Sequence, residues 1–510
     1  MKNRESTAAV FIAEAGPGLP GLLTMRTWEL LGQVDTIVCF GPPNARLLAT
    51  VTPSAKFVSV EENDPSLASL CRILQEKTRK GERILVIKQD RFCFSREFFQ
   101  TLDTLKRAGV EFEFIPGVQP EAAIPALAGI PLGRTAPRAP MLLAADSSSA
   151  SVLRELIKNG GTAVFDSLGR KPAGRIRELL DGGLPDSIPA AVVLDGALFS
   201  QRTLAAPLGA LEGKLMAIGD FTTCTLIVGD EARVWEPLAW FDKRPLFGLR
   251  VLVTRSRDQA RPFVKKLEDL GAEVVLFPTI KIVPPESFAG LDRAIGNLSR
   301  FSWIIFTSVN GVQAFCDRMT AAGLDWRAIK EARLCAIGPK TAQALRAYGL
   351  QVDLVPEIYQ AEGILEAFAK ENVRGLQVLL ARAQEARPDL VQVLRQRGVY
   401  VDEVVAYRTV PDKENAREIL QMLKESKIHI LTFTSSSTVM NFAKAMGDAF
   451  PECVGNAEVV CIGPVTAQTA RDLGLSVQLV PDSFTTDSMI DVLIRNYPRS
   501  RTERRTTHVH

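Results

Sequence analysis

A twenty-residue segment occurs twice in this 510-residue chain, as IGPKTAQALRAYGLQVDLVP at 337–356 and as IGPVTAQTARDLGLSVQLVP at 462–481. Thirteen of the twenty positions are identical. Each copy follows a short apolar run, begins a helical pattern with proline and ends it at a glycine, Gly349 or Gly474. This order is typical of a strand, a helix and a second strand. The repeat therefore predicts two α/β units of similar build.

A second pair of similar segments lies upstream of the first. WIIFTSVNGVQAF at 303–315 corresponds to ILTFTSSSTVMNF at 430–442. Each segment has the pattern of a buried strand, a hydroxyl-rich turn and a helix. The C-terminal half is therefore predicted to form two α/β lobes, and we expect these lobes to face each other.

The N-terminal half alternates apolar strand-like runs with helical stretches, which also indicates α/β structure. A proline-rich stretch at 129–140 interrupts this order before a new series of strands, so we expect subdomains at about 8–135 and 140–235. A second proline-bounded break precedes LRVLVTRS, which begins like the first strand of a new domain. The chain is thus expected to divide near Arg244 into two independent halves.

The composition argues against several classes of protein. Lys and Arg total 61 against 58 Asp and Glu, so the net charge of +3 shows no signature of nucleic-acid or membrane binding. Eight scattered cysteines without a CxxC pair argue against disulfides and metal sites. Because the sequence has neither a leader pattern nor a run of about 18 apolar residues, we expect a soluble cytoplasmic protein. The basic segment 498–510 is expected to be a disordered tail.

Seven motifs follow one another in the C-terminal half: LRVLVTRS, FTSVNGV, AIGPKTA, YQAEGIL, LLARAQEARPDL, VVAYRTV and TFTSSST. This ordered set makes residues 248–497 resemble the uroporphyrinogen-III synthase family. The resemblance implies two α/β lobes joined by a two-stranded linker, with lobe A formed by 248–283 and 411–497 and lobe B by 284–410. It also implies the conversion of hydroxymethylbilane into uroporphyrinogen III, with loss of water, inversion of the last pyrrole ring and no cofactor.

The strand-to-helix turns of this half supply the candidate substrate-binding residues. The first amides of a helix have no partner within the helix and lie at the positive end of its dipole, so a substrate carboxylate can bind there. Side chains in the turns add further donors, and glycines let the backbone approach a ligand. Plain helix capping is the alternative for the same residues. The candidates are Thr254, Arg255, Thr307, Ser308, Asn310, Gly338, Arg382, Thr434, Ser435, Ser436, Ser437 and Gly463.

Tyr407 matches, by the resemblance, the family tyrosine best placed to assist the departure of hydroxide. The hypothesis is that its hydroxyl donates a proton or a hydrogen bond to the leaving group, and that the terminal pyrrole attacks the resulting azafulvene cation through a spiro intermediate. A half-buried structural tyrosine at the junction of the lobes is the alternative. Because the bilane also closes without an enzyme to the uninverted isomer, the protein must mainly impose geometry.

The N-terminal half contains AEAGPGLPGLLTM, FIPGVQPEAAIPALAGIPLGR, GGTAVFDSLG, VLDGALFSQRT and LIVGD. These motifs make a domain at 8–244 resemble the tetrapyrrole methylases, in particular uroporphyrinogen-III methyltransferases, which use S-adenosylmethionine. The cofactor motifs differ from the family pattern. Leu19 replaces an acid, and the family's glycine-rich loop appears as KQDRFCFSRE at 88–97, without glycine. If this half is active, the resemblance places the cofactor at the two turns that contain Gly16, Gly18, Pro116, Gly117 and Val118.

Three functions are compatible with the sequence. The first is a uroporphyrinogen-III synthase whose methylase-like half is inactive or acts as a scaffold, with possible docking of a neighbouring tetrapyrrole enzyme. The second is a bifunctional synthase and methyltransferase, and the third is a non-catalytic two-lobed binding protein for an anionic tetrapyrrole. The glycines of AGPGLPG also fit a dinucleotide motif. Pro17 and Pro20, however, remove amides that a pyrophosphate would need, so we expect no nicotinamide or flavin.

Overall fold

The computed structural model describes residues 9–40, 55–60, 68–88, 96–132, 141–144, 150–166, 168–170, 172–234, 236–329, 331–370, 373–386, 388–411 and 415–497. The predicted tail and most of the segment KQDRFCFSRE lie outside the described residues. The chain forms two compact units, of which unit 1 is Met1–Phe277 with Arg417–His510 and unit 2 is Pro278–Ala416. In the described residues the strands form four five-stranded sheets combined with helices, which confirms the predicted α/β class.

The first sheet is wholly parallel, in the order β3-β2-β4-β1-β5. Its elements are β1 (Val10–Glu14), α1 (Met25–Leu31), β2 (Thr36–Phe40), β3 (Lys56–Val60), α3 (Ala68–Arg79), β4 (Ile84–Lys88), α4 (Arg96–Arg107) and β5 (Phe112–Ile115). Successive side chains of β1 point to opposite faces. Val10 and Ile12 therefore pack with α3 and α4, whereas Phe11 and Ala13 pack with α1.

The second sheet is mixed, in the order β6-β7-β10-β8-β9, and only β6 and β7 pair in parallel. Its elements, with the preceding helix, are α5 (Pro120–Leu127), β6 (Met141–Ala144), α6 (Ala150–Lys158), β7 (Thr162–Phe165), α7 (Pro172–Asp181), β8 (Pro189–Leu194), β9 (Arg202–Pro207), α8 (Leu208–Met216) and β10 (Cys224–Gly229). Helices α6, α7 and α8 cover one face of the sheet, and α5 covers the other.

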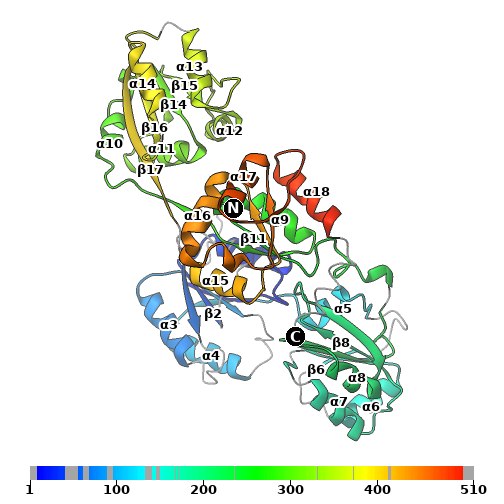
Figure 1. Cartoon of the computed structure of the whole chain (residues 1–510). Coiled ribbons are helices and arrows are strands. Elements are labelled where there is room, and N and C mark those ends of the chain that lie inside the picture. Colours follow the sequence, from blue (N-terminus) through cyan, green and yellow to red (C-terminus); the bar gives the residue numbers. More distant parts are fainter. Residues whose placement is uncertain are drawn as a thin grey trace. The chain divides into compact units, whose positions relative to one another are not determined.

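The third sheet is wholly parallel, in the order β12-β11-β18-β19-β20, and belongs to unit 1. Its elements are β11 (Arg250–Val253), α9 (Arg257–Asp269), β12 (Glu273–Leu276), α15 (Ala416–Lys424), β18 (Ile430–Phe433), α16 (Ser436–Met446), β19 (Glu458–Cys461), α17 (Pro464–Asp472), β20 (Val477–Leu479) and α18 (Thr486–Asn496). Helices α9 and α18 pack on one face, and α16 and α17 lie side by side (Figure 1). The parallel pairing of β11 with β18 joins segments almost 180 residues apart in the chain, as the resemblance implied.

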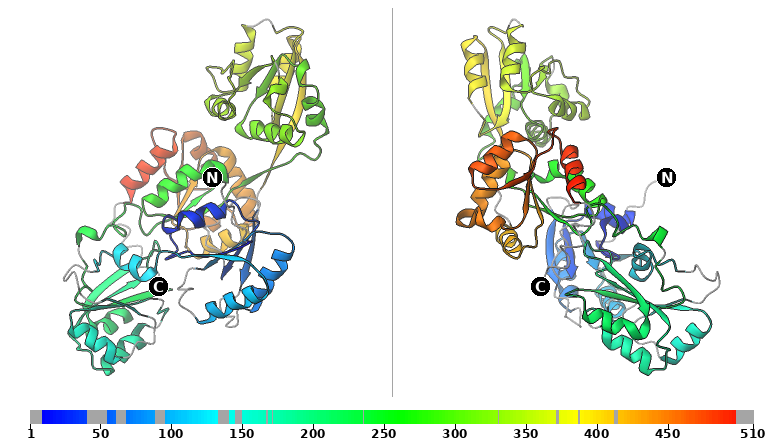
Figure 2. Two further views of the ribbon diagram at one scale, coloured as in Figure 1. Left: turned by 180° about the vertical axis from the view of Figure 1, so that it is seen from behind. Right: turned by 45° about the vertical axis from the view of Figure 1, so that its right-hand side comes forward.

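The fourth sheet forms the centre of unit 2, in the order β13-β17-β16-β14-β15. Its elements are β13 (Ile280–Val283), α10 (Ala289–Ile295), β14 (Trp303–Phe306), α11 (Val309–Ala321), β15 (Arg333–Ala336), α12 (Pro339–Ala347), α13 (Ala361–Ala369), β16 (Gln377–Ala383), α14 (Asp389–Gln396) and β17 (Tyr400–Pro411). Ile304 and Phe306 pack with α10, α11 and α12, whereas Trp303 and Ile305 pack with α13 and α14. Figure 2 shows helices on both sides of this sheet.

The boundary between the two units differs from the predicted one. We expected lobe A to extend to residue 283, but β13 pairs antiparallel with the end of β17 and so belongs to the sheet of unit 2. The hydrogen-bonded partners run from Ile280 with Pro411 to Val283 with Arg408. These backbone hydrogen bonds place the boundary after Phe277.

The two predicted halves of the chain are not independent in the structure. Leu127, Ala197 and Phe241 form a buried cluster to which Phe247 packs. Beside it, the Arg244 guanidinium lies 4.0 Å from the centre of the Phe241 ring. The same guanidinium donates a hydrogen bond of 3.2 Å to the carbonyl oxygen of Glu268 at the end of α9. Residues on both sides of the predicted division near Arg244 therefore form one packed junction.

The helix signals in the repeat are confirmed. α12 begins at Pro339 and α17 at Pro464, directly after glycine N-caps. Gly349 and Gly474, which follow these helices, have φ angles of +79° and +88°. This left-handed conformation favours glycine at the end of a helix.

Two features are absent from the described residues. None of the helices there combines the length and apolar character needed to span a membrane. In the same residues, no group of three or more His, Cys, Asp or Glu side chains is placed to hold a metal ion.

Candidate functional site at the strand ends

The first candidate turn of unit 2 joins β14 to α11. Ser308 is the N-cap of α11, and its side-chain oxygen accepts a hydrogen bond of 3.0 Å from the backbone N–H of Gly311. The same oxygen lies 3.0 Å from the hydroxyl oxygen of Tyr407 on β17. Tyr407 is 8% exposed and packs into the core of unit 2, so it is more buried than the half-buried tyrosine of the structural alternative. The structure thus brings together two of the predicted site residues, which are 99 positions apart.

Gly311 explains how the two hydroxyls come so close. A Cβ atom at this position would lie 3.2 Å from the carbonyl oxygen of Ala381 and 4.0 Å from Cε1 of Tyr407. The first turn of α11 therefore packs directly against the ends of β16 and β17. The predicted residues Thr307 and Asn310 flank this contact and are partly exposed. Gly311 was not among the predicted site residues, although its place in the first turn of the helix was a usable signal.

Arg382 does not have the free guanidinium that its predicted contact with substrate requires. The residue is 5% exposed, and its Nε donates a hydrogen bond of 2.7 Å to the carboxylate of Glu403. A second nitrogen forms an ion pair with the same carboxylate. Arg382 on β16 pairs with Val405 on β17, so Glu403 is its diagonal neighbour across the two strands. The structure therefore directs Arg382 to an internal partner, which sequence reasoning missed.

The corresponding turn of unit 1 joins β18 to α16. Ser435 is the N-cap of α16 and forms a capping box with Thr438. The hydroxyl of Ser437 lies 2.9 Å from that of Ser435 and is exposed. Ser436 accepts a hydrogen bond of 2.8 Å from Thr469 and so connects α16 with α17. Most hydroxyls of this turn are thus engaged in capping and in helix contacts, and Ser437 is the most exposed of its three serines.

Thr434 is the remaining candidate of this turn, and it is partly exposed. No hydrogen bond of its side chain is found within the described part of the chain. Its binding function therefore stays a prediction.

Thr254 and Arg255 follow β11 and differ in what they offer a ligand. Thr254 is 1% exposed and donates a hydrogen bond of 2.8 Å to the carbonyl oxygen of Thr432, so it joins the ends of two strands. Arg255 is partly buried, and this burial lowers the pKa of its guanidinium. Among the described residues, no carboxylate forms an ion pair with Arg255. A partly desolvated cation of this kind suits an incoming carboxylate, whereas Thr254 is committed to the fold.

The two repeat glycines, which are predicted to lie close to a ligand, each have an aromatic neighbour in the structure. Gly338 and Gly463 are the N-caps of α12 and α17, and both have extended backbones that other residues also adopt. A Cβ on Gly338 would lie 3.3 Å from Cβ of Tyr359, and one on Gly463 would lie 2.9 Å from Cδ1 of Phe484. In this structure the missing side chains thus make room for aromatic residues. Sequence reasoning missed both aromatic residues, although they follow the final prolines of the two repeat copies at the same spacing.

The predicted cofactor turns of the N-terminal half also lie together. Gly16 has a φ of +64°, and a Cβ there would lie 2.8 Å from the carbonyl oxygen of Val118. Gly18, with a φ of +88°, completes the left-handed turn. The Glu14 side chain is 3% exposed and accepts hydrogen bonds from the backbone N–H of Gly117, at 3.1 Å, and from the Gln119 amide, at 3.2 Å.

These turns pack directly against each other. A Cβ on Gly117 would lie 2.4 Å from the carbonyl oxygen of Glu14, so the loop after β5 closes directly on the end of β1. The buried carboxylate of Glu14 satisfies the donors of that loop, and the loop at 89–95 lies outside the described residues.

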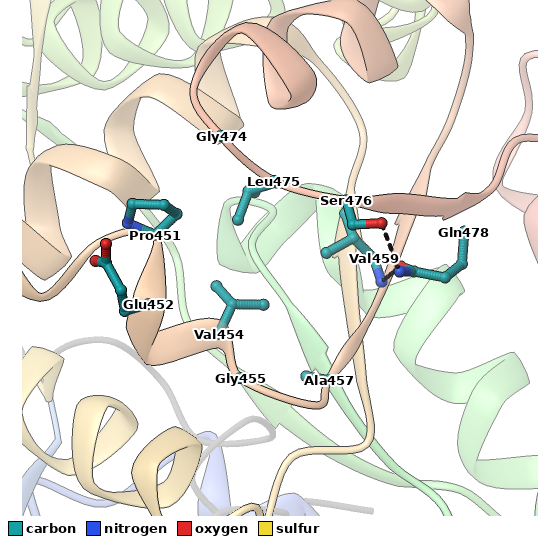
Figure 3. A pocket seen from close by; sticks show the side chains of 10 residues that line it. All are labelled: Pro451, Glu452, Val454, Gly455, Ala457, Val459, Gly474, Leu475, Ser476 and Gln478. Carbon is teal, nitrogen blue, oxygen red and sulfur yellow. Dashed lines mark hydrogen bonds between the residues drawn. The ribbon is translucent and has the colours of Figure 1, made fainter.

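Two pockets lie away from the candidate turns. One is lined by residues between Pro451 and Gln478 at the start of β19 and β20, which is the opposite end of the third sheet from Ser435 and Gly463 (Figure 3). There the side chain of Gln478 accepts a hydrogen bond of 2.7 Å from the Val459 backbone and donates one of 3.1 Å to Ser476. The other pocket lies between α10 and the end of α11. Neither pocket contains a predicted site residue.

The strand ends define a class of protein with two α/β lobes, each with a serine-capped helix, a glycine turn and an exposed aromatic residue at the carboxyl end of its sheet. Comparisons with known proteins agree with this class. Residues 261–491 match the family model described as uroporphyrinogen-III synthase HemD, and residues 10–212 match that of the tetrapyrrole (corrin/porphyrin) methylases.

Three relatives show how far the similarity extends. The chain is 32% identical over 495 residues to the porphyrin biosynthesis protein HemD of Ruminiclostridium josui, covering 95% of this chain and 97% of that protein. It is 32% identical over 265 residues to the uroporphyrinogen-III synthase of Synechococcus elongatus, covering 51% of this chain and 99% of the relative. It is 23% identical over 483 residues to the uroporphyrinogen-III C-methyltransferase of Bacillus subtilis, covering 92% of this chain and 93% of the relative. The chain belongs to the uroporphyrinogen-III synthase family, with a tetrapyrrole methylase domain preceding its synthase domain.

Proposed function

We propose that this chain is a uroporphyrinogen-III synthase that cyclises hydroxymethylbilane with loss of water and inversion of the last pyrrole ring. Membership of the family supports the activity. The observation that carries the site is the contact of 3.0 Å between the hydroxyl oxygens of Tyr407 and Ser308. It connects the candidate acid to the N-terminus of a helix, where negative charge is stabilised.

The hydrogen bonds at this point allow Tyr407 to act as the acid. Ser308 accepts a hydrogen bond from the Gly311 backbone, and its own hydroxyl hydrogen is then available to the Tyr407 oxygen. In this orientation the phenol hydrogen is free to be donated to the leaving hydroxyl of a bound substrate. The phenolate that forms on proton transfer would accept the hydrogen bond from Ser308, which stabilises its charge.

The reaction balances with this single proton. The carbon–oxygen bond of the hydroxymethyl group breaks, the hydroxyl leaves as water with the proton from Tyr407, and the pyrrole electrons generate an azafulvene cation. The terminal pyrrole attacks this cation through its substituted carbon to form the spiro intermediate, which reopens and closes with the ring inverted. The proton that the last ring loses on regaining aromaticity returns to the Tyr407 phenolate.

Arg255 and the capped turns would hold the substrate carboxylates. Arg255 is the strongest candidate because burial already disfavours its charge and no carboxylate among the described residues compensates it. Ser308, Ser435 and Ser437 contribute helix N-termini and hydroxyl donors. Because the uninverted isomer forms without an enzyme, holding the carboxylates in one geometry is the main contribution to the type III product.

The methylase domain is proposed to stabilise the synthase domain. Arg244 lies at the junction described above, and the Arg250 guanidinium at the start of β11 lies 4.7 Å from the ring centre of Phe199 in the N-terminal half. One observation favours the bifunctional alternative: the relative from Bacillus subtilis that matches nearly the whole chain is named as a uroporphyrinogen-III C-methyltransferase. A second activity of this domain is therefore included in the test.

The test supplies the purified chain with hydroxymethylbilane made in situ and with S-adenosylmethionine, and resolves the products by isomer and mass. Type III product without added methyl groups supports a synthase with an inactive methylase domain. Type III product with one or two extra methyl groups supports the bifunctional alternative. If only the type I isomer forms, the synthase proposal is wrong, and a non-catalytic binding protein for an anionic tetrapyrrole takes its place.

A further inference from the structure

Two exposed aromatic residues occupy equivalent positions in the two lobes. Tyr359 in unit 2 and Phe484 in unit 1 each lie three residues after the final proline of a repeat copy, and each is followed closely by a helix. Tyr359 is 59% exposed and Phe484 is 62% exposed. Each lies against the glycine N-cap of the preceding helix, Gly338 or Gly463. The arrangement therefore occurs once in each lobe.

Packing within each lobe accounts for only part of this arrangement. An aromatic residue needed only to cover the backbone would gain most from full burial, whereas both of these leave more than half of their surface in water. The two copies keep an aromatic ring although seven of the twenty preceding repeat positions differ between them. The two sites thus share an aromatic side chain that stays largely exposed.

Both apolar side chains and serine hydroxyls lie in the regions of the two rings. Ile358 beside Tyr359 is 48% exposed, and Val465 beside Gly463 is 75% exposed. The capped serines Ser308 and Ser435 are located at the same carboxyl ends of the two sheets. Each lobe therefore presents an apolar, aromatic surface at the end of the sheet that also carries its hydroxyl donors. A ligand that is an aromatic ring with carboxylate side chains matches both properties.

We propose that Tyr359 and Phe484 are substrate-contacting residues whose open ring faces stack on pyrrole rings of the linear tetrapyrrole. This inference rests on the proposed synthase function and adds the recognition of the rings to the binding of the carboxylates. Stacking restrains the orientation of a pyrrole ring, which carboxylate contacts alone leave free to rotate. The two residues thereby contribute to affinity and to the share of inverted product.

The experiment measures KM, kcat and the ratio of type III to type I product for Tyr359→Leu and Phe484→Leu, with hydroxymethylbilane made in situ. Leucine keeps an apolar cover over the glycine and removes the ring. We expect KM to rise about 3- to 10-fold in each variant, with a larger share of type I product. Tyr359→Phe and Phe484→Tyr keep the ring and should match the wild-type chain. Tyr400→Leu is the matched control, because Tyr400 is 61% exposed and lies at the opposite end of β17 from Tyr407.

A second kind of variant tests the rings without removing them. Gly463→Ala introduces a Cβ 2.9 Å from Cδ1 of Phe484 and must displace that exposed ring. We expect its KM to rise as in Phe484→Leu, with a Tm close to that of the wild-type chain. This variant decides the question for unit 1 if Phe484→Leu has a lowered Tm.

The outcomes separate this inference from the proposed function. The stacking proposal is wrong if both leucine variants have the KM and the isomer ratio of the wild-type chain. If the wild-type chain forms type III product in the same experiment, the synthase function stays intact. Equal losses in the leucine variants and in Tyr400→Leu would also overturn the stacking proposal, because the effect would not be specific to these two rings. If the wild-type chain forms only type I product, the synthase function fails and the stacking inference fails with it.

Discussion

The hydroxyl oxygens of Tyr407 and Ser308 lie 3.0 Å apart, so the candidate acid of unit 2 is hydrogen-bonded to the residue that caps α11. One side-chain oxygen thus satisfies the helix N-terminus and contacts the phenol. The same oxygen receives the Gly311 N–H, which leaves the serine hydroxyl hydrogen free to stabilise a phenolate. A capping function and the proposed catalytic function therefore meet at Ser308.

Tyr407→Phe is expected to slow turnover without abolishing it. Loss of a general acid lowers kcat by roughly 10²-fold or more, but the geometry that directs ring inversion remains. The product should therefore still be mainly type III, and KM should change little. The check is steady-state kinetics with isomer analysis, with Tyr400→Phe as an exposed control on the same strand. Wild-type kcat in Tyr407→Phe would show that the tyrosine is structural.

Ser308→Ala and Ser435→Ala form a matched pair. Each removes an N-cap hydroxyl that accepts a hydrogen bond from the helix backbone, so each should lower the free energy of unfolding by about 1 kcal/mol. Only Ser308 also contacts Tyr407. We therefore expect Ser308→Ala to lower kcat and Ser435→Ala mainly to raise KM. Denaturant unfolding and kinetics of both variants test this, and the same kinetic change in both would exclude a special function of Ser308.

Local signals explain why much of the fold was predictable. Proline at the start of α12 and glycine after its end specify a helix without reference to the rest of the chain. The same holds for the strands, whose apolar runs are short and bounded by turns, as in β2 and β5. The second copy of the repeat then predicted the corresponding elements of the other lobe.

Long-range register explains what was not predictable. Whether Arg382 is free or paired depends on which β17 residue lies diagonally across from it, and the pairing of β16 with β17 shifts register between Arg382 and Ala383. No local pattern reports such a shift. The chemistry of arginine predicts a contact of Arg382 with a substrate carboxylate, whereas in the structure Glu403 decides its orientation.

Arg382→Ala is expected to lower stability, whereas Arg255→Ala is expected to weaken substrate binding. Removal of Arg382 leaves the Glu403 carboxylate without its partner, and we expect a loss of about 1–3 kcal/mol in the free energy of unfolding, because that carboxylate is 34% exposed. The double variant Arg382→Met with Glu403→Gln should lose less than Arg382→Ala. Arg255→Ala should keep the wild-type Tm and raise KM several-fold. The measurements are denaturant unfolding and KM, and a raised KM with wild-type stability in Arg382→Ala would restore its predicted contact with substrate.

Buried thiols give the protein a specific response to alkaline pH. Burial raises the pKa of Cys335 and of Cys461 to about 12, from an ordinary value of 9.0. The unfolded chain therefore ionises these thiols first as the pH rises, and the stability that they contribute is present below pH 9 and lost between pH 9 and pH 12. In Cys335→Ala the free energy of unfolding should fall less steeply between pH 9 and pH 12, by up to about 1.4 kcal/mol per pH unit.

Thiol labelling at pH 8 provides the companion measurement for these cysteines. Cys335 and Cys461 are buried and should stay unlabelled in the folded chain, whereas the partly exposed Cys71 should react. Rapid labelling of Cys335 under native conditions would contradict its burial on β15.

Arg244→Ala tests whether the methylase domain and the synthase domain are stabilised together. The guanidinium lies 4.0 Å from the Phe241 ring centre and donates to the carbonyl oxygens of Phe241 and Glu268, so its removal loses contacts on both sides of the junction. We expect the free energy of unfolding to fall by about 1–3 kcal/mol. Arg244→Lys should lose nearly as much, because lysine keeps the charge but not the planar fork. The exposed Arg233 provides the control variant Arg233→Ala, which should unfold like the wild-type chain.

The decisive observation is the shape of the unfolding curve followed by intrinsic fluorescence and by synthase activity. If both signals are lost together in the wild-type chain and separate in Arg244→Ala, the methylase domain supports the synthase domain through this arginine. Separate transitions already in the wild-type chain would show that the junction carries no stabilising function.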